Sequence, residues 1–408
     1  MPLLRHIAGL SVAGSLLLAL AVPVVSLVAL PQTAQAAETV GAKVGAPLKA
    51  AQDLARAKKF NEALKQVKQA EAISGKTPYE TFVVHDFKAY LNAQSGNYGA
   101  AAEAYEAALN TGKAPANTRA LRIKTIATLY YQGRNFGKAV QYADLYEKET
   151  GPDLQMQTLV AQACYQQGNY AGARDAAAAL VKGATASGRR PPEGVLQIGM
   201  NSAFKLKDQD GYRAALIQLV TYYPSDIYWT DAINQVARKL GTGARASLEV
   251  DRLKLARGVL KTSDAYIEMG QLAIQAGLPG EAQALIEKGT ASGVLGGANK
   301  GRETRLLNMA KSQAAADRPT LSTTAGSARA MAAKAEAYAS YGDTAQAIAL
   351  YKKALAQGGI EDAGLVQMHL GQALLAADKK SEAAQAFASV KHPSRYADLA
   401  YLWALHAR

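Results

Sequence analysis

The sequence predicts an all-α solenoid, in which helix–turn–helix units pack one against the next. Alanine is abundant and proline accounts for only 13 of 408 residues, a composition that favours close-packed helices. No stretch alternates apolar and polar residues over more than a few positions, so strands are not expected. Small and aromatic residues also recur at fixed offsets, most clearly in residues 335–356, whose sequence is AEAYASYGDTAQAIALYKKALA.

Residues 335–356 show how one unit is predicted to be built. A turn at Gly342 separates two amphipathic stretches. Ala347 opens the second stretch, where the two helices must approach closely, and Tyr351 fills the space between one pair and the next. A single pair of this kind cannot bury its own apolar face, so copies of it must stack.

The alanines that open the second helices register the units along the chain. We place units near residues 44–77, 82–115, 120–153, 154–187, 196–225, 226–258 and 263–295. The steps from 215 to 282 and from 282 to 347 are 67 and 65 residues, about twice one repeat, so each gap should contain a degenerate unit. About nine to ten units are therefore expected. The register alanines are Ala63, Ala101, Ala139, Ala173, Ala215, Ala282, Ala347 and Ala383.

Several segments depart from the repeat pattern. Lys182–Gly194 contains glycine, serine and two adjacent prolines and is predicted to be a loop. Residues 300–316 form one degenerate helix that ends the solenoid of residues 37–316. Residues 317–327 are predicted to be a flexible connection. Residues 328–408 then hold a pair of units and a C-terminal helix, Ser394–Arg408, that caps the last repeat.

The N-terminus has the features of an export signal. Arg5 precedes an apolar run over residues 7–30, and Ala34 and Ala36 offer small residues for cleavage. We expect residues 1–36 to be removed and the remaining chain to be periplasmic. An uncleaved anchor in the inner membrane is the alternative, because the apolar run is long. Cleavage removes one cation and changes the net charge from +13 to +12.

No pattern in the sequence predicts catalysis, a metal site or a cofactor. His85, His369, His392 and His406 are isolated and are expected to be ordinary structural or surface residues. The single cysteine, Cys164, excludes an internal disulfide. Lysine and arginine are spread along the chain without dense blocks, which argues against nucleic acid as a partner. We therefore expect a protein that is not an enzyme.

The concave face of the solenoid is the predicted binding site. The first helix of each unit should line it with amide, tyrosine and charged side chains, which hydrogen-bond and stack on an extended peptide. Tyr131 and Tyr165 take equivalent positions in adjacent units and should lie side by side. A polar, solvated face without a ligand is the alternative. The predicted partner-binding residues are Gln52, Arg56, Asp86, Tyr90, Gln94, Lys124, Tyr131, Gln132, Gln162, Tyr165, Gln166, Lys207, Asn234, Arg238, Gln271 and Gln275.

The repeat residues named above resemble the tetratricopeptide repeat (TPR) superfamily over nearly the whole chain after the leader. A narrower resemblance is to exported TPR proteins of proteobacteria that belong to TonB energy-transduction systems. Three stretches carry it, residues 219–239, 263–295 and 349–387. The Ala-rich composition and the predicted loop at 182–194 depart from that group.

These resemblances imply a scaffold that binds envelope proteins and has no cofactor. The implied partner is a TonB/ExbB/ExbD-type complex or an outer-membrane receptor that it serves. A scaffold for polysaccharide export or envelope assembly is an alternative. A cell-wall lytic enzyme is less favoured, because no segment outside the repeats is long enough to hold a catalytic domain.

Overall fold

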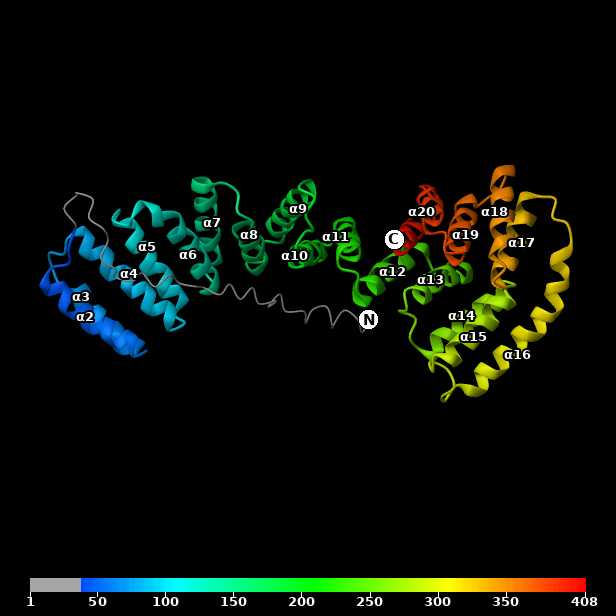
Figure 1. Cartoon of the computed structure of the whole chain (residues 1–408), viewed down its shortest axis with the longest axis horizontal. Coiled ribbons are helices and arrows are strands. Elements are labelled where there is room, and N and C mark those ends of the chain that lie inside the picture. The colour runs from blue at the N-terminus through cyan, green and yellow to red at the C-terminus, as the bar shows by residue number, and fades with distance from the viewer. Residues whose placement is uncertain (1–37) are drawn as a thin grey trace. The chain divides into compact units, whose positions relative to one another are not determined.

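The computed structural model describes residues 38–408, which form twenty α-helices, α2 to α21, and two short 3₁₀ helices (Figure 1). No strand occurs among these residues, and none of their helices is long and apolar enough to cross a bilayer. The predicted all-α fold of successive helical pairs is confirmed. The predicted leader, residues 1–36, lies outside the described residues.

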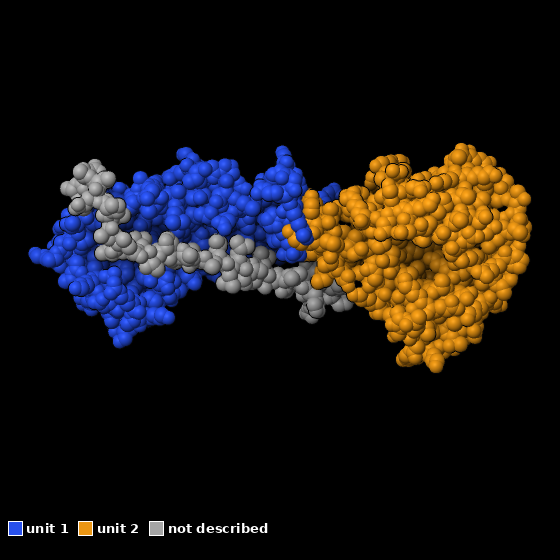
Figure 2. All heavy atoms as spheres, viewed as in Figure 1, with its two compact units in different colours: residues 1–215 blue, residues 216–408 orange. Residues whose placement is uncertain are grey.

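The chain divides into two compact units at residues 215 and 216, within helix α11 (Figure 2). Unit 1 covers described residues 38–215 and unit 2 covers residues 216–408. The helices of unit 1 are α2 (Ala42–Arg56), α3 (Phe60–Ala72), α4 (Pro78–Gln94), α5 (Tyr98–Asn110), α6 (Arg119–Gln132), α7 (Phe136–Thr150), α8 (Leu154–Gln166), α9 (Tyr170–Ala186), α10 (Glu193–Lys205) and the start of α11 (Gln209–Tyr222), with the 3₁₀ helix η1 at Ala116–Thr118.

Local sequence determines where these helices begin and end. Thr77 caps α4 through a capping box, in which its hydroxyl accepts from the Glu80 N–H and the Glu80 carboxylate accepts from the Thr77 N–H. The first helix of a pair ends in a residue with left-handed backbone, such as Gly96 (φ 76°) or Gly168 (φ 78°). Glycine adopts this conformation without a steric penalty, so it ends the helix sharply.

The alanine register holds the pairs together. Ala101, Ala139 and Ala173 are each 0% exposed, and Ala101 and Ala139 lie in one apolar cluster with Tyr105 and Tyr130. A larger side chain at these positions would have no room, because interiors are close-packed. The small residues therefore set the distance between helices, and the tyrosines fill the gaps that remain.

The predicted loop at Lys182–Gly194 is too long at its N-terminal end, because α9 continues to Ala186. Gly183 is inside the helix and is tolerated there at a cost of about 1 kcal/mol. Leu180 and Ala184 are buried on the same helix and supply compensating packing. The chain leaves the helix at Gly188 (φ 67°), so only the short segment before α10 is irregular.

Unit 2 contains the rest of α11 and ten further helices. They are α12 (Asp226–Leu240), α13 (Ala244–Ala256), α14 (Ser263–Gln275), α15 (Pro279–Ala291), α16 (Lys300–Asp317), α17 (Ala328–Ser340), α18 (Thr344–Gln357), α19 (Ala363–Ala376), α20 (Lys380–Ala388) and α21 (Ala397–His406), with the 3₁₀ helix η2 at Arg318–Ser322.

The segment predicted as a flexible connection, residues 317–327, lies inside unit 2. Its first half is the end of α16 followed by η2, and two tyrosines of α17 and the turn after it hold it in place. The Tyr338 hydroxyl donates to the Leu321 carbonyl at 2.8 Å, and the Tyr341 hydroxyl donates to the Asp317 carboxylate at 2.7 Å. The boundary between the compact units therefore lies about a hundred residues before this segment.

Helix α21 covers the last repeat and also returns to the start of unit 2. Trp403 stacks on Phe387 of α20, with ring centroids 5.7 Å apart. The Lys239 ammonium of α12 lies 2.7 Å from the Asp398 carboxylate of α21. These contacts close the helices of unit 2 into a ring, which can be followed from α12 to α21 in Figure 1.

Candidate functional site

The left-handed turn residues give every first helix a common numbering. In unit 1 they are Lys58, Gly96, Arg134, Gly168 and Lys207. Successive first helices contact one another, as α6 does α8 and α8 does α10, so they form the inner row of the solenoid. We call the residue six places before each turn residue the inner position. In unit 1 it holds Gln52, Tyr90, Thr128, Gln162 and Asn201.

Four of the five inner positions of unit 1 are polar and partly open, whereas Thr128 is buried and its hydroxyl donates to the Lys124 carbonyl. Gln52, Tyr90, Gln162 and Asn201 are half-buried, and none of their side chains has a hydrogen-bond partner among residues 38–408. Tyr90 stacks on Phe87 at 6.1 Å between ring centroids. Amides that both donate and accept, next to a flat aromatic surface, can bind the main chain of a peptide.

Two of the predicted partner-binding residues, Asp86 and Lys124, form ion pairs within the protein that join its helices to one another. Asp86 accepts hydrogen bonds from the Arg122 guanidinium, which also lies over the Phe82 ring at 5.0 Å. The Lys124 ammonium lies 2.7 Å from the Asp153 carboxylate at the start of α8. These charges are already paired, so they stabilise the stack of helices and are poor candidates for binding a partner.

Tyr131 and Tyr165 lie at the ends of α6 and α8 and cover the turns that follow them. Each ring packs edge-on against the aromatic residue that opens the next helix, Tyr131 on Phe136 at 5.5 Å and Tyr165 on Tyr170 at 5.4 Å. Burial raises the pKa of both phenols. Both rings are half-buried, so part of each contributes to the fold and only the remainder could contact a ligand.

The other predicted residues fall into three groups. Arg56, Gln94, Gln132 and Gln166 are the last residues of first helices. Lys207 was predicted on a first helix, but α10 ends at Lys205 and Lys207 is the left-handed turn residue (φ 60°). The glycine that marks other turns is missing there, so the end of the helix was misplaced. Asn234, Arg238, Gln271 and Gln275 belong to α12 and α14 of unit 2.

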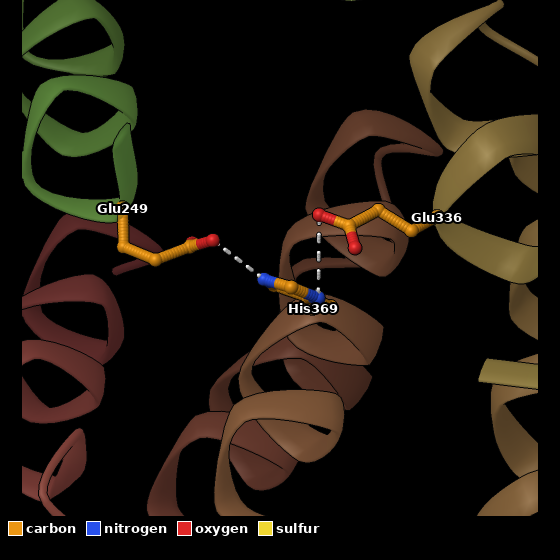
Figure 3. A group of neighbouring side chains, drawn as sticks. All are labelled: Glu249, Glu336 and His369. Carbon is orange, nitrogen blue, oxygen red and sulfur yellow. Dashed lines mark hydrogen bonds and ion pairs between the residues drawn. The ribbon is translucent and has the colours of Figure 1, made fainter. Parts of the chain in front are cut away.

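Sequence reasoning missed a buried group of charges in unit 2. Its members are Arg245, Glu249 and Arg252 of α13, Glu281 of α15, Glu336 of α17 and His369 of α19. Figure 3 shows Glu249 and Glu336 reaching His369 from opposite sides. Glu336 is at the inner position of α17, six residues before Gly342, and Arg252 has the same spacing from the left-handed Gly258 that follows α13.

Glu249 is the centre of this group. Its side chain is fully buried, and its Oε1 atom accepts from Arg252 Nη1 at 2.7 Å and lies 2.9 Å from His369 Nε2. Burial alone would raise the pKa of Glu249, but the charges of Arg252 and His369 outweigh it and hold the pKa well below its usual value. The carboxylate therefore stays ionised inside the protein.

Arg252 links four helices. It makes two bonds to the Glu281 carboxylate, from Nε at 2.8 Å and from Nη2 at 2.6 Å, and Nη2 also lies 3.2 Å from Glu336 Oε1. Burial would lower its pKa, but Glu249 and Glu281 raise it well above the ordinary value. Burial is likewise outweighed at Glu336, whose pKa is lowered by His369 and the two arginines.

Three of these side chains could in principle hold a metal ion, because ligand atoms of Glu249, Glu336 and His369 lie within 4.8 Å of one another. The guanidinium groups argue against it. Arg245 and Arg252 both contact the same Glu336 oxygen and both lie within 3.4 Å of His369 Nε2. A cation there would meet two fixed positive charges. The group is better suited to hold three inner helices together than to bind an ion or a substrate.

Comparison with known proteins identifies the repeat. Residues 124–188 and 332–398 match the tetratricopeptide repeat family, one segment in each unit. None of the curated proteins matches the chain.

Solved structures include similar repeat proteins. A tetratricopeptide repeat protein from Parabacteroides merdae is 12% identical with a TM-score of 0.33, over 82% of this chain and 100% of that one. The C-terminal part of a TPR repeat-containing protein from Cytophaga hutchinsonii is 15% identical with a TM-score of 0.30, over 78% and 97%. The TPR2AB domain of yeast Sti1, in complex with pHSP90, is 15% identical with a TM-score of 0.26, over 71% and 99%. Scores this low establish no shared overall arrangement.

Proposed function

We propose that this chain, which carries tetratricopeptide repeats, is a non-enzymatic scaffold that binds a protein segment along the inner face of unit 1. One observation carries the proposal. The side chains of the inner positions Gln52, Tyr90, Gln162 and Asn201 are half-buried and have no hydrogen-bond partner among the described residues, whereas Arg252 and Glu336 of unit 2 are joined to one another. The unpaired amides of Gln52, Gln162 and Asn201 can form hydrogen bonds with the main chain of a peptide.

We further propose that the partner is an envelope protein in the periplasm, belonging to a TonB/ExbB/ExbD-type complex or an outer-membrane receptor that it serves. The leader-like residues before Ala37 and the resemblance carried by residues 219–239, 263–295 and 349–387 support this step. This second proposal requires that the chain is exported. It can therefore be wrong while the proposed binding face of unit 1 is right.

Site-specific photocrosslinking in the native cell tests the binding face. A photoreactive residue is placed at Gln162 or Asn201 on the inner face, and at Gln141 or Asp175 on exposed positions of the second helices α7 and α9. We expect a discrete crosslinked protein from the inner pair only, with mass spectrometry identifying it as a component of an envelope complex. Equal crosslinking from both pairs would contradict the inner-face site.

The location has its own test. Intact mass spectrometry of the protein isolated from its native envelope should give a chain that begins at Ala37. A mass that includes residues 1–36 would favour the anchored form, and recovery of the protein only from the cytoplasm would contradict the periplasmic proposal.

A further inference from the structure

The turns between first and second helices of unit 1 share one geometry. In each, the N–H of the residue after the turn residue donates to the carbonyl five positions earlier, as Asn97 does to Asn92 and Asp208 to Ala203, both at 2.9 Å. This is the Schellman arrangement, which requires a left-handed residue. Because every helical pair of unit 1 repeats this geometry, the turns lie along one edge of unit 1, which we call the turn edge.

Cations and glycines alternate along the turn edge. The left-handed positions hold Lys58, Gly96, Arg134, Gly168 and Lys207 in order. Residues other than glycine rarely adopt this backbone conformation, and the two glycines show that the turn forms without a side chain at this position. Lys58, Arg134 and Lys207 are exposed and have no ion-pair partner among the described residues. In unit 2 the left-handed positions that follow α13, α14, α17 and α19 hold Gly258, Gly277, Gly342 and Asp378, and no cation.

Helix dipoles do not explain this pattern. A cation near the C-terminus of a helix is favourable, but that would apply equally at Gly96 and Gly168 and at the turns of unit 2. The alternation is therefore a property of unit 1 that the fold itself does not require.

The surroundings of these cations are mostly cationic and amide-bearing. Arg56 and Lys205 lie two residues before Lys58 and Lys207, while Gln94 and Gln166 take that place beside the glycine turns. The nearby acidic residues are all paired with other cations. Near Lys58, Asp53 lies 3.9 Å from Arg56 and Glu62 lies 3.7 Å from Lys59. Near Lys207, Asp208 lies 3.4 Å from Arg174 and Asp210 lies 3.7 Å from Arg213.

Neighbouring turns are close enough to act together. A Cβ on Gly133 would lie 2.8 Å from the backbone nitrogen of Gly99, so the end of α6 abuts the start of α5. The Lys205 ammonium lies over the Tyr170 ring at 6.0 Å, so the end of α10 reaches the start of α9. The Arg134 turn therefore adjoins the Gly96 turn, and the Lys207 turn adjoins the Gly168 turn.

We propose that the turn edge of unit 1 binds an extended, acidic protein segment. Carboxylates of the segment pair with Lys58, Arg134 and Lys207 at alternate turns, and the amides of Gln94 and Gln166 bond its main chain between them. The intervening amides favour a peptide over a lipid surface, because anionic head groups reward charge alone. This surface is separate from the inner face, so either site can fail while the other stands.

Binding of a fluorescein-labelled oligoglutamate peptide to the full chain tests the proposal. The test variant is Lys58→Gly/Arg134→Gly/Lys207→Gly, and the matched control removes the same charge elsewhere on unit 1, Lys43→Gln/Lys148→Gln/Lys182→Gln. We expect the test variant to bind about tenfold more weakly, as three exposed ion pairs would give. The control should change less than about twofold.

The fold is monitored by thermal melting in parallel. Glycine suits the left-handed backbone, so the melting temperature should not fall. If it does, Lys58→Asn/Arg134→Asn/Lys207→Asn replaces the test variant, because asparagine also tolerates this conformation. An equal loss of peptide affinity in the test and control variants would show that only net charge matters, and it would contradict a binding site at the turn edge. Binding to phosphatidylglycerol vesicles without binding to the peptide would overturn the acidic-protein partner in favour of a membrane surface.

Discussion

The same position of the repeat has opposite environments in α8 and α10 of unit 1 and in α17 of unit 2. In unit 1 the inner positions Gln162 and Asn201 are half-buried without hydrogen-bond partners among the described residues. In unit 2 the inner position of α17, Glu336, accepts from Arg245 at 2.5 Å and from Arg252, also of α13, at 3.2 Å. One face is available for a ligand, while the other is occupied by the protein's own side chains.

Ring closure accounts for this difference. In unit 2 the helices return on themselves, so the inner faces of α13, α17 and α19 meet. Side chains that meet there must be compatible in a medium of low dielectric, and three carboxylates are offset by two guanidiniums and His369. Curvature, set by small rotations between successive repeats, therefore decides whether an inner face becomes a groove or a core.

Removal of the central charge should have the largest effect. Glu249→Gln leaves Arg245 and Arg252 in a buried site without their shared carboxylate, and breaking such a buried pair costs about 3–5 kcal/mol. We expect that loss in the free energy of unfolding of unit 2, measured by chemical denaturation. The exposed neighbour Glu268 of α14 provides the control, since Glu268→Gln should change it by less than about 0.5 kcal/mol. Equal effects of the two variants would mean that the group does not hold the ring closed.

The buried register alanines should contribute equally to the stability of both units. Their substitution therefore tests helix packing independently of the difference between the inner faces. Ala139→Leu in unit 1 and Ala347→Leu in unit 2 each overpack a contact that is 0% exposed, at a cost of about 1–3 kcal/mol. Ala178→Leu, at an exposed position of α9, is the control. Thermal melts that fail to distinguish the buried from the exposed substitutions would show that the register is misassigned.

Acid should weaken unit 2 through its buried carboxylates. The folded pKa values of Glu249 and Glu336 are lowered from 4.5. A carboxyl with a depressed pKa contributes stability that is present above its unfolded pKa and is lost as the pH falls through its folded value. Below about pH 4.5 we expect the unfolding free energy of unit 2 to fall by on the order of 1 kcal/mol per pH unit for each proton taken up. Glu249→Gln should flatten this dependence, and an unchanged slope in that variant would contradict the assignment.

The sequence was sufficient to predict the fold, because its signals are local. Ala101, Ala139 and Ala173 mark close helix contacts at positions that turned out to be fully buried. Aromatic residues after the turns, such as Phe136 and Tyr170, were likewise readable from spacing alone. The end of α9 was less predictable, since Gly183 looks like a helix breaker until the packing of Leu180 and Ala184 is known.

The buried charges could not be located in this way. Glu249 and His369 are 120 residues apart, and their approach depends on the curvature summed over all the intervening helices. Sequence reasoning treated His369 as an isolated histidine. A weak signal was present, since Arg252 and Glu336 replace the amides found at the inner positions of α2, α8, α10 and α14. Charged residues at that position could have indicated that inner faces meet.

The smallest expected effect is also the sharpest test of the comparison. Gln162→Ala and Asn201→Ala remove inner side chains of unit 1 that contact no hydrogen-bond partner among residues 38–408. Each should change the free energy of unfolding by less than about 0.5 kcal/mol, as surface substitutions usually do. Glu336→Ala, at the same position of α17, leaves Arg245 and Arg252 without one of their acceptors and should be clearly destabilising. If Gln162→Ala destabilises unit 1 by more than about 1.5 kcal/mol, its inner face is part of the core, and the open groove on which the binding proposal rests does not exist.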